Sequence, residues 1–166
     1  MRISSDELFD LANKAWDANE LGKAFDLFIQ AKNQGCYFAL NSIGYFYDHG
    51  ICVKKDQNAA LTWYRRAARH NDSCAFSNIA IIYRDRGNFN RAKYWFLKAI
   101  HNGDADAAFE LAKLYLAKNK NKSSMMAKHY LRIASESSHI DSFDQQEALR
   151  LLSSLDDIDQ NNHSPR

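Results

Sequence analysis

The chain has 166 residues, of which 46% are apolar and 25% are charged, so it is long enough for one domain with a continuous core. Its first ten residues hold one basic residue and no apolar segment, and its apolar runs fall far short of the roughly 20 residues that cross a bilayer. We therefore expect neither a secretory signal nor a membrane span. Three widely spaced cysteines without a CxxC pair predict reduced thiols in a cytoplasmic protein.

Charge is unevenly distributed along the chain. Residues 1–50 carry four Lys or Arg against seven Asp or Glu, residues 51–133 carry sixteen against six, and residues 134–166 carry two against seven. A basic middle segment between acidic ends can steer an acidic partner. Solvated helix faces also produce such blocks without any function.

Four repeats of 32 to 36 residues, each a helix, a turn and a helix, cover approximately residues 5–36, 37–72, 73–104 and 105–138. In the second helix of each repeat, two alanines seven residues apart enclose a large residue four positions after the first alanine. These residues are Ala24, Phe28 and Ala31; Ala60, Tyr64 and Ala67; Ala92, Phe96 and Ala99; and Ala127, Leu131 and Ala134.

The first helix of each repeat has its own pattern, a large apolar residue followed by a small one that lets a neighbouring helix approach. The pairs are Leu11 and Ala12, Ile43 and Gly44, Ile79 and Ala80, and Leu111 and Ala112. The connections between repeats fall near Gly35, Asn71 and Gly103, where a helix end favours a residue that tolerates positive φ. One helix pair cannot bury its apolar face alone, so the pairs are expected to stack.

The pattern changes after the fourth repeat. Residues 140–155 predict one amphipathic capping helix, and the polar, acidic residues 156–166 predict a disordered tail. The expected fold is all-α: a right-handed α-solenoid of about four antiparallel helix pairs plus this capping helix, forming a single domain over residues 1–155.

The second repeat resembles a Sel1-like repeat, a relative of the tetratricopeptide repeat. The matching residues are Ala39, Ile43, Gly44, Tyr47, Gly50, Val53, Asp56, Ala60, Trp63, Tyr64, Ala67 and Ala68. Where such repeats usually carry a second glycine, this chain has Cys52, so either the turn avoids positive φ there or Cys52 adopts it under strain. The resemblance implies an adaptor or scaffold that binds through a concave groove, not a catalyst.

No catalytic or metal-binding motif accompanies the repeats. The six histidines form no HExxH motif or zinc ligand set, and neither a glycine-rich phosphate loop nor a GxSxG turn occurs. The sequence therefore predicts a protein that is not an enzyme and holds no metal or cofactor.

A partner is expected on the concave face, which the first helices of tetratricopeptide-like repeats line. The inward places are held by Phe9, Asn13 and Trp16; Asn41, Tyr45 and Asp48; Ser77, Ile81 and Arg84; and Phe109, Lys113 and Leu116. This row is rich in aromatic residues, as interface hot spots are. Trp16 fits the groove and the core equally well, because it lies one position after the tyrosines of the other repeats.

The leading hypothesis is a protein-binding module, and its most specific form is a bacterial immunity protein that neutralises a secreted toxin. A general adaptor or a secretion chaperone is the alternative within this class. Nucleic-acid binding through the basic middle segment is the alternative from another class, with no membrane partner expected. Its candidate phosphate contacts are Arg65, Arg66, Arg69, Lys93 and Lys98.

Overall fold

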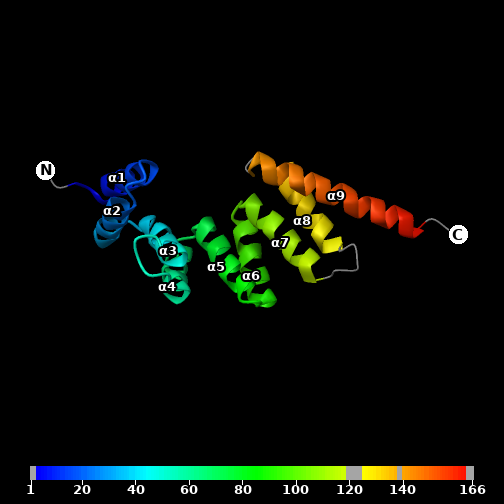
Figure 1. Cartoon of the computed structure of the whole chain (residues 1–166), viewed down its shortest axis with the longest axis horizontal. Coiled ribbons are helices and arrows are strands. Elements are labelled where there is room, and N and C mark those ends of the chain that lie inside the picture. The colour runs from blue at the N-terminus through cyan, green and yellow to red at the C-terminus, as the bar shows by residue number, and fades with distance from the viewer. Residues whose placement is uncertain (1–2, 119–124, 138–139, 164–166) are drawn as a thin grey trace. The chain divides into compact units, whose positions relative to one another are not determined.

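The computed structural model describes residues 3–118, 125–137 and 140–163, and the regular secondary structure in these ranges is α-helical throughout (Figure 1). This confirms the predicted all-α class. The helices are α1 (Ser5–Asp17), α2 (Leu21–Asn33), α3 (Ala39–His49), α4 (Gln57–Ala68), α5 (Ser73–Asp85), α6 (Phe89–His101), α7 (Ala105–Lys118), α8 (Met125–Glu136) and α9 (Ser142–His163).

The chain forms two compact units, residues 1–82 (unit one) and 83–166 (unit two), and the boundary falls within α5. In unit one, α1 packs against α2, α2 against α3, and α3 against α4. In unit two, α6 packs against α7, α7 against α8, and α9 against both α8 and α7. A single continuous domain over residues 1–155 stays a prediction.

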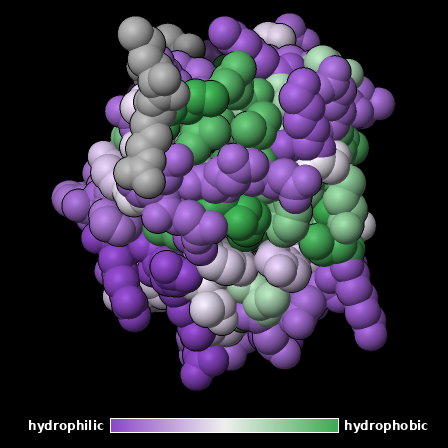
Figure 2. All heavy atoms as spheres, turned by 90° about the vertical axis from the view of Figure 1, so that its left-hand side faces the viewer, coloured by the Kyte–Doolittle hydropathy of each residue, from purple (hydrophilic) through white to green (hydrophobic). Residues whose placement is uncertain are grey.

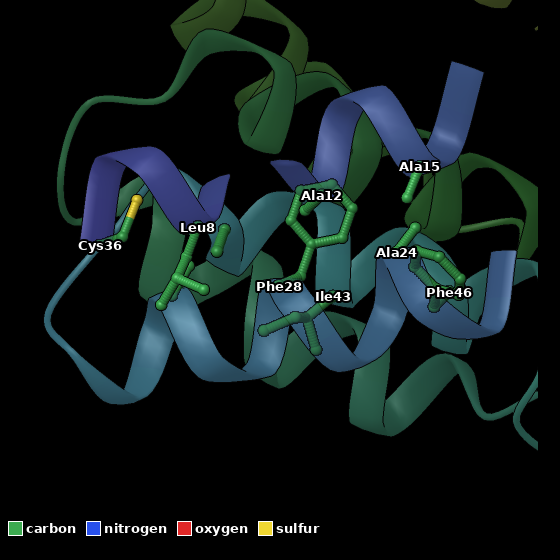
Figure 3. Close-up of a cluster of buried hydrophobic side chains, with 10 residues drawn as sticks. Leu8, Ala12, Ala15, Ala24, Phe28, Cys36, Ile43 and Phe46 are labelled. Carbon is green, nitrogen blue, oxygen red and sulfur yellow. The ribbon is translucent and has the colours of Figure 1, made fainter. Parts of the chain in front are cut away.

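The alanines of the second helices form the seams of this packing. All eight predicted alanines and the four large residues between them are at most 1% exposed, which confirms the alignment that placed them in the core. Figure 3 shows how such side chains meet in unit one, where Ala24 and Phe28 of α2 lie among residues of α1 and α3. Side chains of one methyl group let the helices approach, and the larger ones fill the remaining space.

Residues with positive φ end the helices where the sequence predicted them. Gly35, Asn71 and Gly103 have φ values of 97°, 59° and 85°, so the expected left-handed connections are confirmed. Cys52 has a φ of 57°, which settles the alternative left open for the turn between α3 and α4. A cysteine in this region carries backbone strain that the glycine of related repeats avoids.

The start of α1 is fixed by a capping box. The Ser4 Oγ accepts a hydrogen bond from the Glu7 amide at 3.2 Å, and the Glu7 carboxylate accepts one from the Ser4 amide at 2.8 Å. The hydrogen bond from the Ser4 amide, followed by one from the Ser4 side chain to the same carboxyl, lowers the pKa of Glu7. Two amides that the helix itself leaves without a partner are thereby satisfied.

Replacing Ser4 with alanine is expected to lower the free energy of unfolding by about 1 kcal/mol, because the Glu7 amide then loses its acceptor. Urea denaturation followed by circular dichroism measures the change. Ser5→Ala is the control, since Ser5 lies one position inside the helix and caps no amide. Equal losses for the two variants would contradict the capping role of Ser4.

Leu11 departs from the predicted repeat. Its counterparts Ile43, Ile79 and Leu111 are fully buried, whereas Leu11 is 41% exposed. It lines a hollow between α1 and α2 together with Ala15 and Leu27. Figure 2 looks onto the side on which α1 and α2 lie and shows apolar side chains gathered between hydrophilic ones. Leu11 is exposed because it lines this hollow, which the two helices do not fill.

The last helix is longer than predicted. It runs from Ser142 to His163, so it replaces most of the tail that was expected to be disordered from residue 156 onward. Two features explain the difference. No glycine or proline interrupts residues 142–163, and Lys128 of α8 forms an ion pair of 2.6 Å with Asp156, which holds this part of α9 against α8.

Candidate partner-binding face

A pocket lies between α1 and α3 in unit one. Its volume is about 180 Å³, and Asn13, Trp16, Phe28, Asn41, Ser42 and Tyr45 line it. Four of these residues were predicted for the partner-binding face from the sequence: Asn13, Trp16, Asn41 and Tyr45. Residues three and four apart share one side of a helix, so α1 contributes Asn13 and Trp16 together, and α3 contributes Asn41 and Tyr45.

Aromatic contacts hold the walls of this pocket in place. The Trp16 ring meets the Tyr45 ring edge-on, with centroids 5.6 Å apart, and also packs edge-on against the buried Phe46 at 5.2 Å. Trp16 is half-buried, so it belongs to the core through Phe46 and to the surface through the pocket. The interpretation of Trp16 as a core residue is supported by its contact with Phe46, and its role in a partner-binding groove stays a prediction.

Histidine and asparagine side chains support the α3 wall from outside the pocket. The His49 ring stacks on the Tyr45 ring with centroids 3.9 Å apart, and its Nδ1 lies 3.1 Å from the Tyr45 carbonyl oxygen. Asn78 of α5 donates a hydrogen bond of 3.0 Å to the Asn41 Oδ1. These contacts fix the orientation of Tyr45 and Asn41, and neither His49 nor Asn78 was predicted for the site.

The remaining unit-one residues of the predicted row do not line the pocket. Phe9 is half-buried and packs on Phe28 at 5.7 Å and on the exposed Phe38 at 6.0 Å. Asp48 is half-buried one helical turn after Tyr45. Ser77 and Ile81 are half-buried on α5. Phe38 adds an aromatic surface next to Phe9, and it was missed because it precedes the first residue of α3.

Tyr64 of α4 lies beneath this face. Its side chain is completely buried, and burial, followed by the nearby Asp48 carboxylate, raises the pKa of its hydroxyl. The hydroxyl lies close to Asp48 but has no partner in hydrogen-bonding geometry among the described residues. Tyr64 therefore stays protonated and serves as a packing residue at the α3–α4 seam.

In unit two, the predicted row is charged, and one of its members belongs to the core. Arg84 forms ion pairs with Glu110 and with Asp85, and Lys113 forms one with Glu110. Phe109 is 2% exposed, so its predicted place on an open face is wrong. Because α6, α8 and α9 all pack against α7, more of this helix is covered than in the other repeats. Leu116 is half-buried.

The basic residues proposed as phosphate contacts are partly engaged with aromatic rings. The guanidinium of Arg66 lies 4.6 Å from the centroid of the Trp63 ring in unit one. In unit two, Lys93 lies over Tyr115 and Lys98 lies over Tyr94 and Trp95. These cation–π contacts explain part of the basic middle segment as surface packing.

The described residues meet the requirements of neither a metal site nor a membrane span. Across residues 3–118, 125–137 and 140–163, no group of three His, Cys, Asp or Glu side chains is placed to hold a metal ion. In the same part of the chain, none of the helices is both long and apolar enough to cross a membrane.

The Sel1 repeat family model matches residues 19–36, 38–72, 83–104 and 105–139. The chain belongs to the Sel1 repeat family. Repeats of this family are typically non-catalytic protein-interaction modules. The match includes Phe28 of α2 and the lining residues of α3 but not α1, so Asn13 and Trp16 are the two of the six lining residues that lie outside the matched repeats.

Relatives and solved structures agree with this assignment. A Sel1-like repeat-containing protein of Acanthamoeba polyphaga mimivirus, L21, is 27% identical over 114 residues, which is 69% of this chain. The chain spans about a fifth (21%) of that relative. A Sel1 repeat protein from Oxalobacter formigenes has a TM-score of 0.67 at 24% identity, over 90% of this chain and 73% of its own. A protective antigen of uropathogenic Escherichia coli strains, with an SLR fold, also has a TM-score of 0.67. It is 25% identical, and the alignment covers 81% of this chain and 31% of the antigen chain.

Proposed function

We propose that this Sel1 repeat chain binds a partner protein through the face formed by α1 and α3 of unit one (the α1–α3 face: Phe9, Asn13, Trp16, Asn41 and Tyr45). The observation that supports this proposal is the pocket, where two half-buried aromatic rings and two carboxamides converge. Aromatic side chains beside hydrogen-bonding groups are typical of the few residues that carry most of an interface's binding energy.

The finer proposal is that the partner is a secreted bacterial toxin and that the chain is its immunity protein. Its support comes from the repeat architecture alone, which offers a rigid face but does not fix the identity of a partner. A single interface burying about 1,600 Å² would be sufficient for such a role. A general adaptor or a secretion chaperone would use the same face.

Tyr45→Ala is expected to weaken the partner complex at least about tenfold, because it removes one wall of the pocket. The partner is sought by co-expressing the chain with the products of neighbouring genes and recovering stoichiometric complexes at moderate salt. Titration calorimetry then compares the wild-type chain with the variant. Tyr94→Ala is the control, because Tyr94 is an exposed tyrosine of α6 in unit two. Tyr45 is a better probe than Arg84, whose ion pairs would also be lost.

Three outcomes would contradict the proposal or its finer form. If Tyr45→Ala binds the partner with the same affinity as the wild type, the α1–α3 face is not the binding site. A partner that does not harm cells when expressed alone would exclude the immunity role and leave an adaptor. Retention of nucleic acid only, lost as salt rises from low to moderate concentration, would favour the basic middle segment instead.

A further inference from the structure

The pocket of unit one has uncharged walls. Trp16 and Tyr45 present ring surfaces, Phe28 is fully buried behind them, and the remaining lining residues are Asn13, Asn41 and Ser42. Within the described residues Asn13 forms no hydrogen bond, so its carboxamide is available to a ligand. Asn41 already accepts one hydrogen bond from Asn78, and its oxygen has a second lone pair. The pocket thus combines aromatic surface with hydrogen-bond acceptors.

Carboxylates flank this pocket along α1. Asp10 precedes Asn13 by three residues and Asp17 follows it by four, so both are neighbours of Asn13 on the helix surface. Asp6 lies one turn further along the same side, and all three are exposed. On α3, Asp48 follows Tyr45 by three residues. None of these four forms an ion pair with a residue that the structure describes. Lys14, also on α1, lines the separate hollow between α1 and α2.

Aromatic walls, acceptor groups and flanking carboxylates that form no ion pair with the described residues fit a planar cation. A guanidinium stacks on aromatic rings and offers five N–H donors in a fixed plane. A lysine ammonium is compact and strongly hydrated, and it makes poorer use of flat walls. A carboxylate would be repelled by the aspartates, and an aliphatic side chain would leave the carboxamides unpaired.

We propose that this pocket binds an arginine side chain of the partner protein. The guanidinium lies against Trp16 and Tyr45 and donates hydrogen bonds to Asn13 and Asn41, while the aspartates of α1 supply the opposite charge. The proposal rests on the proposed function in one respect, namely that the arginine belongs to a protein partner. It adds the chemistry of the anchor residue and a charge requirement for the partner surface.

A short peptide tests the pocket without knowledge of the partner. The probe is acetyl-Gly-Ser-Arg-Ser-Gly-amide, and the matched control replaces arginine with citrulline, which has nearly the same shape but no charge. A third peptide carries lysine. Binding is followed in ¹⁵N-labelled protein by the indole N–H resonances of the three tryptophans, with Trp16 assigned from the Trp16→Phe variant. We expect the arginine peptide to shift the Trp16 resonance saturably, the lysine peptide to bind more weakly, and the citrulline peptide to have no effect.

Protein variants test the charge requirement separately. The double substitution Asp10→Asn and Asp17→Asn is expected to weaken binding of the arginine peptide roughly threefold to tenfold, as loss of exposed ion pairs does. Asp26→Asn is the control, because Asp26 is an exposed aspartate of α2 whose neighbours Ala24 and Phe28 face the core. These surface substitutions leave the core untouched, so they report on charge and not on folding.

The inference is overturned if the arginine and citrulline peptides shift Trp16 equally, or if Trp63 and Trp95 respond as strongly as Trp16. It is also overturned if the Asp10 and Asp17 double variant binds as the wild type does. Failure here is distinct from failure of the proposed function. If Tyr45→Ala weakens the partner complex but the arginine peptide does not bind the pocket, the α1–α3 face remains the proposed binding site and arginine is excluded as the anchor residue.

Discussion

Replacing Gly44 with alanine is expected to lower the free energy of unfolding by about 1–3 kcal/mol, the usual cost of forcing extra volume into a packed core. A Cβ at this position would lie 2.6 Å from Cδ1 and 2.7 Å from Cε1 of Tyr64. The Tyr64 ring is completely buried and cannot swing aside into solvent. Alanine gains about 1 kcal/mol over glycine in helix propensity, but a contact this short outweighs that gain.

Gly22→Ala, in the same unit, is expected to raise the free energy of unfolding, whereas Gly44→Ala is expected to lower it. Gly22 lies in the first turn of α2, and a Cβ there would meet no atom within 4 Å. The propensity term acts alone at this position, so stability is expected to rise by up to about 1 kcal/mol. Urea denaturation of both variants, read by circular dichroism, compares the two signs. A Gly44→Ala protein as stable as Gly22→Ala would mean that the α3–α4 seam is not closely packed.

The seams themselves could be predicted from the sequence because their cause is local. An alanine at a fixed offset on a helix marks a close approach wherever the helix lies, and the burial of all eight alanines follows from that spacing alone. The repeat pattern also predicted that the position of Gly44 holds a small residue so that a neighbouring helix can approach. Its particular contact with the Tyr64 ring could not be predicted, because it depends on the register between α3 and α4.

The candidate site was predicted in part for the same reason. Helical periodicity placed Asn13 and Trp16 on one side of α1, and Asn41 and Tyr45 on one side of α3, and these four line one pocket. Phe109 was misplaced because its burial depends on which helices pack against α7, and the spacing within one helix does not contain that information. The supporting contacts of His49 and Asn78 arise from side-chain orientations that spacing does not specify.

The end of α9 shows a different limit. Composition alone made residues 156–166 resemble a disordered tail, since they are polar and acidic. The ion pair between Lys128 and Asp156 joins residues 28 positions apart, and a composition argument contains no information about such a partner. A run free of glycine and proline was the one local signal that favoured a longer helix.

Leu8→Ala and Leu11→Ala are expected to differ several-fold in their effect on stability, although they change the same residue type in the same helix. Leu8 is 3% exposed and packs in the core between α1, α2 and α3 (Figure 3), so its loss leaves a cavity and costs about 2–5 kcal/mol. Leu11 is 41% exposed, and much of its side chain meets water in the folded state as well. Its truncation is expected to cost less than about 1 kcal/mol.

Leu111→Ala completes the comparison, because Leu111 holds in α7 the repeat position that Leu11 holds in α1. Leu111 is fully buried, so its truncation is expected to cost about 2–5 kcal/mol, like that of Leu8. Urea denaturation gives the three values, with unchanged slopes showing that the unfolded states are comparable. A large loss for Leu11→Ala would mean that something covers the α1–α2 hollow in solution. Residues at equivalent repeat positions therefore share the same spacing in sequence. Their contributions to the free energy of unfolding differ, because different helices pack around each of them.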